Sequence, residues 1–412
     1  MKRKILTSRK KGGNPRNKGY HALRGTRRYL DNSATTPVAE EVLQAMEPYW
    51  AIQYGNPSSP HLRGVAAEKT MNSCRNQLGS MLRVNPARLI FTASGTEANN
   101  LALQGVANIP YFLHHPGHII STPIEHPSVL NVIKHLKERG WSVSYLSVDG
   151  FGRIEPQEVA ELLQPNTKIV STMLVNNELG TIAPINEIGR LIEIENQERQ
   201  HKIVYHVDAV QALGHIPLDI SEARAQLFTF SGHKIFGPKG VGLLYAHPQA
   251  QLRPIMFGGN QEGGLRPGTE NIPAIVGFTK ADQLVTENLD ASSKQLKTLR
   301  QALTNGIKTI ADTRINSPED GAPHLLNASF PGIRGEVLVH FLEQKRVFVT
   351  MGAACSSKKK GASHVLESID LGQDEIHSAI RFSLAPTVTL DQIRYVVYSL
   401  KDTVEEIRNI YV

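Results

Sequence analysis

The chain has 412 residues, of which 40% are hydrophobic and 20% charged, a composition typical of a soluble globular protein with two or three domains. No run approaches the ~18 apolar residues that span a bilayer, which excludes a membrane-embedded class. With only two cysteines, Cys74 and Cys355, a disulfide scaffold is excluded as well, and we expect a reducing, cytoplasmic compartment.

The first 28 residues carry a charge unlike that of the rest. Residues 1–28 hold eleven lysines and arginines and no acid, so the remainder has 34 basic and 38 acidic residues, a net charge of −4, although the whole chain has +7. Gly12, Gly13 and Pro15 argue against an amphipathic targeting helix. The pattern predicts a basic, disordered leader; organelle targeting and a nucleic-acid-binding tail remain alternatives.

From about residue 86 to residue 246, short β-rich runs alternate with helical patterns. The alternation predicts βαβ units and a mainly parallel sheet, which collects ligands at the carboxyl ends of its strands. The seven runs are Leu89–Thr92, His118–Ser121, Val143–Ser147, Ile169–Val175, Ile203–Val207, Leu227–Phe230 and Val241–Tyr245.

The first of these runs leads through Ser94, Gly95 and Thr96 to Glu97. At the start of a helix, the backbone N–H groups of Gly95 and Thr96 and the Thr96 hydroxyl would bind a phosphate. The same four residues also fit a helix capping box. The local sequence leaves both interpretations open.

Two later strand ends supply a carboxylate and an amine. Asp208 follows an apolar strand, with Gln211 three positions beyond, and Lys234 lies in the stretch SGHKIFGPKG. This stretch is a poor nucleotide-binding loop, because Pro238 stands where a Walker-type loop needs lysine. One cofactor needs a lysine for a Schiff base, an acid for its pyridine nitrogen and a phosphate cradle together, namely pyridoxal 5′-phosphate (PLP).

After about residue 285 the pattern changes. A long polar-periodic helix precedes short strands at Asn327–Phe330 and Arg381–Ser383 and a final helix from about 389 to 409, which predicts a smaller α+β domain. We therefore expect a large PLP-binding domain over residues 46–289. Residues 29–45 and 290–412 would form the small domain, which would carry the loop around Cys355.

The order of the motifs resembles that of class V, fold-type I PLP enzymes, and among them the cysteine desulfurases. The resemblance extends from Tyr29 to about Leu400 and implies an α/β fold with a mainly parallel seven-stranded sheet. It rests on Tyr29–Pro37, Gly55–His61, Glu125–His126, Val175–Gly180, His206–Ala209, Ser231–Lys234, Leu265–Thr269, Ala354–Ser356 and Arg381–Leu384.

The resemblance also implies roles for single residues. Lys234 would hold the cofactor covalently, and His126 would stack on its ring. Asp208 would pair with the pyridinium nitrogen of the cofactor. Gln211 and Asn177 would surround the ring oxygen and the bound amino acid. Gly95, Thr96, Ser231 and His233 would hold the phosphate, with Thr269 from a partner subunit, so a homodimer is expected. Arg381 would clamp the substrate carboxylate. The alternative to this cofactor role of His126 is a structural histidine at a strand end, bonded to a backbone carbonyl. We expect His61 and His206 to be structural.

Cys355 distinguishes a desulfurase from its transaminase relatives. It lies in MGAACSSKKKGAS, where small residues suit a mobile loop and three lysines favour a thiolate. Its alignment with the Ser-x-Ala-Cys loop of the desulfurases favours a nucleophile over an idle cysteine, whereas Cys74 is expected to be an inert buried thiol. We expect no metal site, apart from transient ligation of a cluster iron by Cys355.

The implied reaction converts L-cysteine to L-alanine and leaves a persulfide on Cys355, with Lys234 and His126 as the other catalytic residues. The persulfide would pass to a sulfur-acceptor protein, either an iron–sulfur scaffold or a tRNA-thiolation enzyme, and the lysine run favours an acidic acceptor. Selenocysteine lyase and another class V PLP aminotransferase are alternative activities. A non-catalytic desulfurase-like subunit is disfavoured by the intact Lys234, Asp208 and Cys355.

Overall fold

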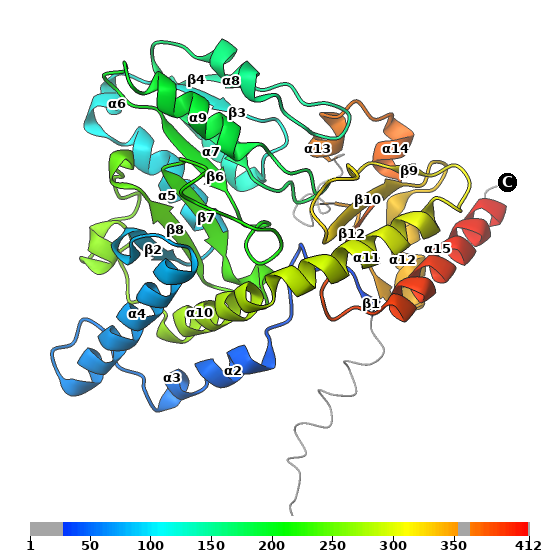
Figure 1. Ribbon diagram of the computed structural model, residues 1–412, viewed down its shortest axis with the longest axis horizontal. Helices are drawn as coiled ribbons and strands as arrows, with labels where there is room; N and C mark the ends of the chain where they lie inside the picture. The colour runs from blue at the N-terminus through cyan, green and yellow to red at the C-terminus, as the bar shows by residue number, and fades with distance from the viewer. Residues whose placement is uncertain (1–27, 353–362, 411–412) are drawn as a thin grey trace, which may run out of the picture.

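The computed structural model describes residues 28–352 and 363–410. Figure 1 shows a larger body around a central sheet and a smaller body beside it, with helices α10 (Ile272–Glu287) and α11 (Leu289–Ile307) running from the first to the second. The leader up to residue 27 and the segment with Cys355 lie outside the described residues. Arg28, which we assigned to the leader, instead begins strand β1 (Arg28–Tyr29) and pairs with Val347.

The large body contains the predicted seven-stranded sheet. Its strand order is β2-β8-β7-β6-β5-β3-β4, and only β8 runs antiparallel to its neighbours, so the expectation of a mainly parallel sheet is confirmed. The strands are β2 (Leu89–Thr92), β3 (His118–Ser121), β4 (Ser142–Tyr145), β5 (Thr167–Met173), β6 (Val204–Asp208), β7 (Leu227–Ser231) and β8 (Gly242–Ala246).

Helices cover both faces of this sheet, as is typical of mainly parallel sheets. Helices α5 (Gly95–Ala107) and α7 (Pro127–Glu138) share one apolar cluster with the sheet, and α4 (Leu62–Met81), α9 (Ile185–Glu195) and α10 share another on the opposite face. Shorter helices complete the layer: α2 (Glu40–Met46), α3 (Pro48–Ala51), α6 (Pro110–His114), α8 (Pro156–Leu162) and the 3-10 turns η1 (Pro86–Arg88), η2 (Gly232–Lys234), η3 (Pro248–Ala250) and η4 (Gln261–Gly264).

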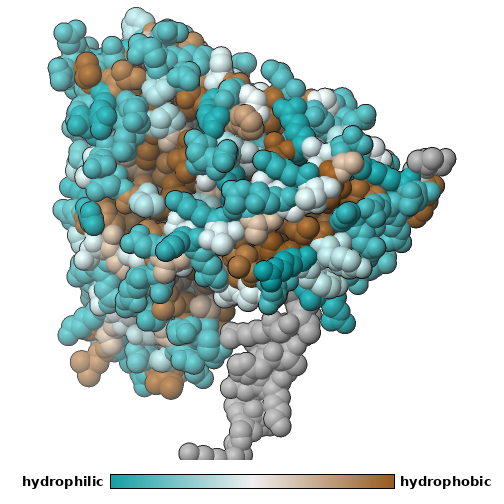
Figure 2. Space-filling model, turned by 45° about the vertical axis from the view of Figure 1, so that its right-hand side comes forward, coloured by the Kyte–Doolittle hydropathy of each residue, from teal (hydrophilic) through white to brown (hydrophobic). Residues whose placement is uncertain are grey.

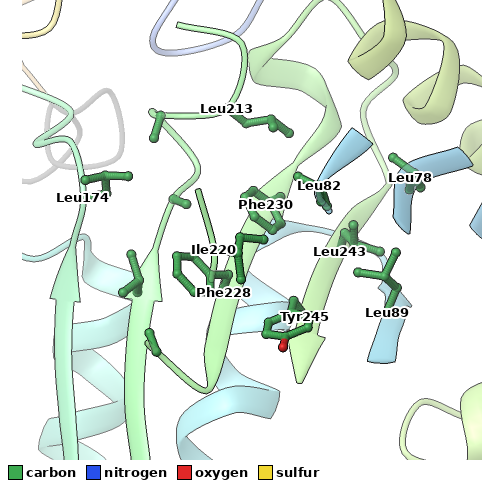
Figure 3. Packing of buried hydrophobic residues seen from close by; sticks show 14 of the residues in the cluster. Leu78, Leu82, Leu89, Leu174, Leu213, Ile220, Phe228, Phe230, Leu243 and Tyr245 are labelled. Carbon is green, nitrogen blue, oxygen red and sulfur yellow. The ribbon is translucent and has the colours of Figure 1, made fainter. Parts of the chain in front are cut away.

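Alternate residues of one strand fill one face of the core. Phe228 and Phe230, two positions apart on β7, project to the same side and stack with ring centroids 6.3 Å apart, beside Leu243 and Tyr245 of β8 (Figure 3). Burying each phenylalanine contributes roughly 1.5–3 kcal/mol. This packing fixes the end of β7, from which Lys234 follows.

The small body has its own sheet and its own apolar cluster, which includes Leu30 and residues of α11. Its three-stranded sheet has the order β12-β10-β9, and β1 pairs with β11. The elements are β9 (Arg314–Ile315), β10 (Leu325–Ser329), α12 (Gly335–Gln344), β11 (Val347–Phe348), α13 (His364–Glu367), α14 (Gln373–His377), β12 (Ala379–Ser383) and α15 (Leu390–Ile410). Figure 1 shows α15 lying alongside α11.

The boundary between the bodies differs in one place from our expectation. Residues 29–45 were expected in the small domain, but Val42 of α2 packs with Met46 in the cluster of the large sheet. Both side chains lie on the buried face of a helix that packs against α10.

No helix of the described ranges is long and apolar enough to cross a membrane. The face of the molecule in Figure 2 is mostly hydrophilic, with apolar patches between the polar side chains. Large apolar side chains are nevertheless well exposed around α3 and the start of α4, among them Trp50 and Leu62.

Candidate functional site

A cavity of about 240 Å³ lies where the carboxyl ends of the parallel strands meet the small body. Asp208 ends β6 and Ser231 ends β7, so the sheet itself carries these side chains to the cavity. Ten of the predicted site residues line it together: Gly95, Thr96, His126, Asn177, Asp208, Gln211, Ser231, His233, Lys234 and Arg381. The eleventh, Thr269, is exposed and does not line the cavity of its own chain.

Lys234 lies in η2, directly after β7. Its Nζ donates hydrogen bonds to the carbonyl oxygens of Ser33 at 2.5 Å and Ala34 at 2.8 Å. Both carbonyls belong to the segment between β1 and α2. The lysine amine is therefore held at the junction of the two bodies.

Asp208 is 5% exposed and accepts two hydrogen bonds. Its Oδ2 accepts from Asn99 Nδ2 at 2.8 Å and its Oδ1 from the Val210 backbone N–H at 3.0 Å. Asn99 Nδ2 also donates to Ser128 Oγ at 2.8 Å, which lies 2.7 Å from His126 Nδ1. A chain of hydrogen bonds thus connects the carboxylate to the histidine.

His126 is the N-cap residue of α7, and its Nδ1 accepts from the Ser128 backbone N–H at 3.1 Å. Its capping partner is an N–H group, not the backbone carbonyl of the alternative hypothesis. Burial lowers the pKa of His126, against the opposing effect of the nearby Asp208. The ring is therefore held neutral at the wall of the cavity.

The N-terminus of α5 supports both interpretations of its sequence. Ser94 Oγ accepts from the Glu97 N–H at 3.1 Å, and Glu97 Oε2 accepts from the Ala93 N–H at 2.8 Å. The capping interaction is present, and Gly95 and Thr96 still line the cavity. A Cβ on Gly95 would come within 2.9 Å of a Val210 methyl group, so the backbone reaches the cavity only because the residue is glycine.

His233 faces the same end of the cavity. Its Nδ1 lies 3.1 Å from Thr35 Oγ1. Burial, reinforced by Lys234 and Lys239, lowers the pKa of His233 to about 4. A neutral ring contributes a hydrogen bond to an anion and no formal charge.

Arg381 enters the cavity from the small body and is 2% exposed. It lies in the middle of β12, where its Nη1 donates to the Asn177 carbonyl oxygen at 3.0 Å and its Nη2 to Asp31 Oδ1 at 2.9 Å. The cavity is thus bounded by a lysine on the large body and an arginine on the small one.

Other residues singled out in the sequence lie elsewhere. His61 caps α4 by accepting from the Gly64 N–H, and the buried His206 lies between Ser171 and Thr229 with its pKa lowered by burial to about 4. Both contacts are those of structural histidines. Cys74 is buried, and burial raises the pKa of its thiol, which favours the inert form. Cys355 lies outside the described residues.

The family model for class-V aminotransferases matches residues 28–396. The chain belongs to this family. Cysteine desulfurase IscS of Methanosarcina thermophila is 38% identical over 92% of this chain and 93% of its own length, and a cysteine desulfurase of Trichormus azollae is 39% identical over the same shares. Among solved structures, a NifS-like protein has a TM-score of 0.86 and 35% identity over 92% of this chain and 100% of its own. The fold is that of fold-type I PLP enzymes.

The class-V aminotransferases depend on PLP, and the cavity fits this cofactor. Three buried polar atoms on cavity-lining residues, Ser33 Oγ, Asn99 Oδ1 and Gln211 Oε1, have no hydrogen-bond partner among the described residues. Unpaired buried polar atoms are costly, so these three are available to bond a ligand in the cavity. An amine, a carboxylate and a helix N-terminus around them match the aldehyde, the ring nitrogen and the phosphate of PLP.

Several contact residues were not found from the sequence, and four of them illustrate why. Asp31, Ser33 and Ala34 lie in the motif Tyr29–Pro37, which supported the resemblance but received no role. Asn99 lies one helical turn after Gly95, on the face of α5 that turns toward the cavity. That spacing is the signal that could have identified it.

Proposed function

We propose that this class-V aminotransferase family member is a PLP-dependent cysteine desulfurase, which forms L-alanine and a persulfide on Cys355 from L-cysteine. The observation that carries the proposal is the pair of cations at one cavity, since Lys234 supplies an amine for the cofactor and Arg381 a guanidinium for an amino acid's carboxylate. The names of the similar proteins support the same activity.

The residues that line the cavity would contact different parts of the cofactor. Gly95, Thr96, Ser231 and His233 would hold the phosphate, and Asp208 would pair with the protonated ring nitrogen. When bound, PLP withdraws electrons from the α-carbon of the amino acid joined to it. The hydrogen bonds from Asn99 and Val210 keep the Asp208 carboxylate aimed in one direction.

Lys234 would move the protons of the reaction. Once its Nζ is released from the cofactor, it is the amine within the cavity that can take the substrate's α-proton and return it. The carbonyls of Ser33 and Ala34 accept hydrogen bonds from this Nζ and would orient it within the cavity. His126 would pack against the cofactor ring, and Asn177 and Gln211 would contact its ring oxygen and the amino acid.

Cys355 would be the nucleophile. Its thiolate attacks the substrate sulfur, so that an S–S bond forms and the substrate's C–S bond breaks, with the electron pair left on carbon and a proton added there to give alanine. The described residues flanking the segment 353–362 meet at one carboxylate, because Ser363 Oγ donates to Glu178 Oε2 at 2.7 Å and Gly352 packs against the same group. Glu178 adjoins Asn177 of the cavity.

A homodimer is part of the proposal. Trp50, Ile52, Tyr54, Leu62 and Phe257 are between 62% and 89% exposed, and large apolar side chains exposed near one another favour a protein interface. The exposed Thr269, predicted to reach the phosphate of a partner's site, lies only twelve positions after Phe257. A two-fold dimer would cover these side chains and bring Thr269 to the second site.

The sulfur acceptor would be an iron–sulfur scaffold or a tRNA-thiolation enzyme, with an acidic surface for Lys358, Lys359 and Lys360. The cytoplasm is the proposed compartment, given the small number of cysteines. Selenocysteine lyase is the second candidate activity, because the same amine, carboxylate and guanidinium would hold selenocysteine.

The test is a product assay on purified protein loaded with PLP and given a thiol reductant. L-Cysteine should yield L-alanine and sulfide in equal amounts, and a keto acid should leave both yields unchanged. Alanine from L-selenocysteine but not from L-cysteine would support the lyase instead. Consumption of a keto acid with formation of a new amino acid would show a transaminase and contradict the proposal.

A further inference from the structure

Arg381, the proposed carboxylate clamp, is already paired with a carboxylate of the protein. Its Nη2 donates to Asp31 Oδ1 at 2.9 Å, and the Arg381 side chain is 2% exposed against 19% for Asp31. No role was predicted for Asp31, which adjoins the cavity without lining it. The following inference rests on the proposed function, because it concerns the amino acid that Arg381 would bind.

The guanidinium keeps donors for a second partner. Of its five N–H groups, the hydrogen bonds among the described residues use two, one to Asp31 Oδ1 and one to the Asn177 carbonyl oxygen. Nε is buried and has no hydrogen-bond partner in the described part of the chain. A ligand carboxylate can therefore bind while Asp31 stays in place.

The backbone around Asp31 is fixed on both sides. Asp31 forms a parallel bridge with Ser383 of β12, and the Ala34 N–H donates to the Asp31 carbonyl oxygen at 3.1 Å. The Asn32 N–H donates to the Ser383 carbonyl oxygen at 3.3 Å. Because its backbone is bonded to the strand that carries Arg381, the Asp31 carboxylate stays beside the guanidinium when a ligand arrives.

A purely structural ion pair is the simpler explanation, but the position of the pair beside the cavity indicates an effect on ligand binding as well. Burial raises the pKa of the Asp31 carboxyl, and the Arg381 charge opposes this effect. A ligand carboxylate on the remaining donors of Arg381 would lie beside the Asp31 carboxylate, and like charges in a partly buried site repel. Asp31 therefore weakens the binding of any ligand carboxylate while it orients the group that binds it.

Such weakening suits a reaction in which substrate and product share the carboxylate. L-Cysteine and L-alanine would make the same contact with Arg381, so a stronger contact would retain the product as well as bind the substrate. A contact that binds the substrate and the transition state equally strongly does not accelerate the chemical step.

We propose that Asp31 sets the affinity of the cavity for the α-carboxylate of monocarboxylic amino acids, by holding the Arg381 guanidinium in place and offsetting part of its charge. Asp31 is a specificity-determining residue in this account and acts through Arg381.

The test is the binding of two probes without sulfur, L-alanine and L-alaninamide, to the PLP-loaded protein, measured by the change in visible absorbance. Asp31→Asn keeps an oxygen that can accept from Nη2 but removes the charge. We expect it to bind L-alanine at least about fivefold more tightly than the unchanged protein, and L-alaninamide, which has no carboxylate, within about twofold, because only the first probe carries the negative charge that Asp31 repels. Equal or weaker binding of L-alanine by a folded Asp31→Asn protein would overturn the proposal, as would an equal gain for both probes.

Asp31→Ser is the second variant, and Asp320→Asn, which removes another arginine-paired carboxylate at the surface, is the control. Asp31→Ser should shift the affinity for L-alanine in the same direction and Asp320→Asn should not shift it. A cooperative thermal transition in each protein separates misfolding from lost binding, and failure of every folded variant to bind L-alanine also overturns the proposal. The assay needs no sulfur release, so tighter L-alanine binding in a protein that yields no sulfide from L-cysteine would refute the proposed function alone.

Discussion

Lys234 Nζ lies 2.5 Å from the carbonyl oxygen of Ser33, a residue 201 positions earlier in the chain. The lysine belongs to the turn η2 that follows strand β7 of the large sheet, and the carbonyl to the segment that enters from the small body. Their contact closes the cavity between the two bodies. Substitutions on either side of this junction should therefore change the binding of the cofactor or the substrate without a matching change in the free energy of unfolding.

Lys234→Ala should abolish the visible absorbance that a lysine-bound PLP gives and reduce alanine formation from L-cysteine by about 10³-fold or more, because both covalent attachment and proton transfer are lost. Lys239→Ala is the control, since Lys239 follows in the same stretch and does not line the cavity. Spectra and product yields of the two variants should differ sharply. A Lys234→Ala protein with the absorbance of the unchanged enzyme would refute the role of the lysine.

Asn99→Ala should weaken PLP binding by about tenfold, because it removes a hydrogen bond to a buried carboxylate, worth ~1.5–3 kcal/mol. Asn100→Ala, on the same helix, is the matched control, because the Asn100 side chain bonds a backbone oxygen of its own helix. Titration of the two apoproteins with PLP measures the effect. Equal affinities would show that Asn99 does not position Asp208.

Glu125→Gln should reduce the loss of stability that occurs as the pH rises from about 5 to 8. Burial raises the pKa of Glu125 to about 8, above the ordinary value of 4.5, and its Oε2 has no hydrogen-bond partner among the described residues. Because the folded-state pKa is raised, the stability from Glu125 is complete below about pH 4.5, falls by ~1.4 kcal/mol per pH unit between about 4.5 and 8, and no longer changes above about 8. Glutamine keeps the neutral shape, so thermal unfolding between pH 5 and 8 should vary less in the variant than in a Glu138→Gln control. Identical pH profiles would contradict the assignment.

Ser363→Ala should lower the rate of persulfide formation by about tenfold and leave PLP affinity unchanged. The Ser363 hydroxyl bonds the buried Glu178 carboxylate, and the next residue, His364, places Nε2 2.9 Å from the Glu125 carbonyl oxygen. Loss of the hydroxyl would loosen the stem of the segment that contains Cys355. Ser368→Ala, which removes a bond within the same helical region, is the control. A normal rate in Ser363→Ala would show that this contact does not position the nucleophile.

The sequence was most informative where a strand-like hydrophobic pattern and a side chain with suitable chemistry occur together. All seven strands of the large sheet were predicted, because each is a short β-rich run, and ten of the eleven predicted cofactor and substrate contacts in the described residues share one cavity. Spacing alone identified Asp208 and Lys234, since both follow apolar strands whose carboxyl ends meet at one edge of the sheet.

What the sequence did not provide are the contacts between distant segments. Nothing in the local pattern of Asp31 or Ser33 indicates that one pairs with Arg381 and the other with Lys234, because these contacts depend on how the small body packs against the large one. The membership of Val42 in the large core was missed for the same reason. A helix of seven residues has an apolar face, but its sequence does not say which body covers it.

The most direct measurement of the central claim is mass analysis of the peptide that contains Cys355, after the PLP-loaded protein has reacted with L-cysteine without reductant. We predict the mass of one added sulfur atom on Cys355 together with one L-alanine released per persulfide. Cys355→Ala should keep the absorbance of bound PLP and form neither product. Alanine formation at the normal rate by Cys355→Ala, or added sulfur found only on Cys74, would contradict the account.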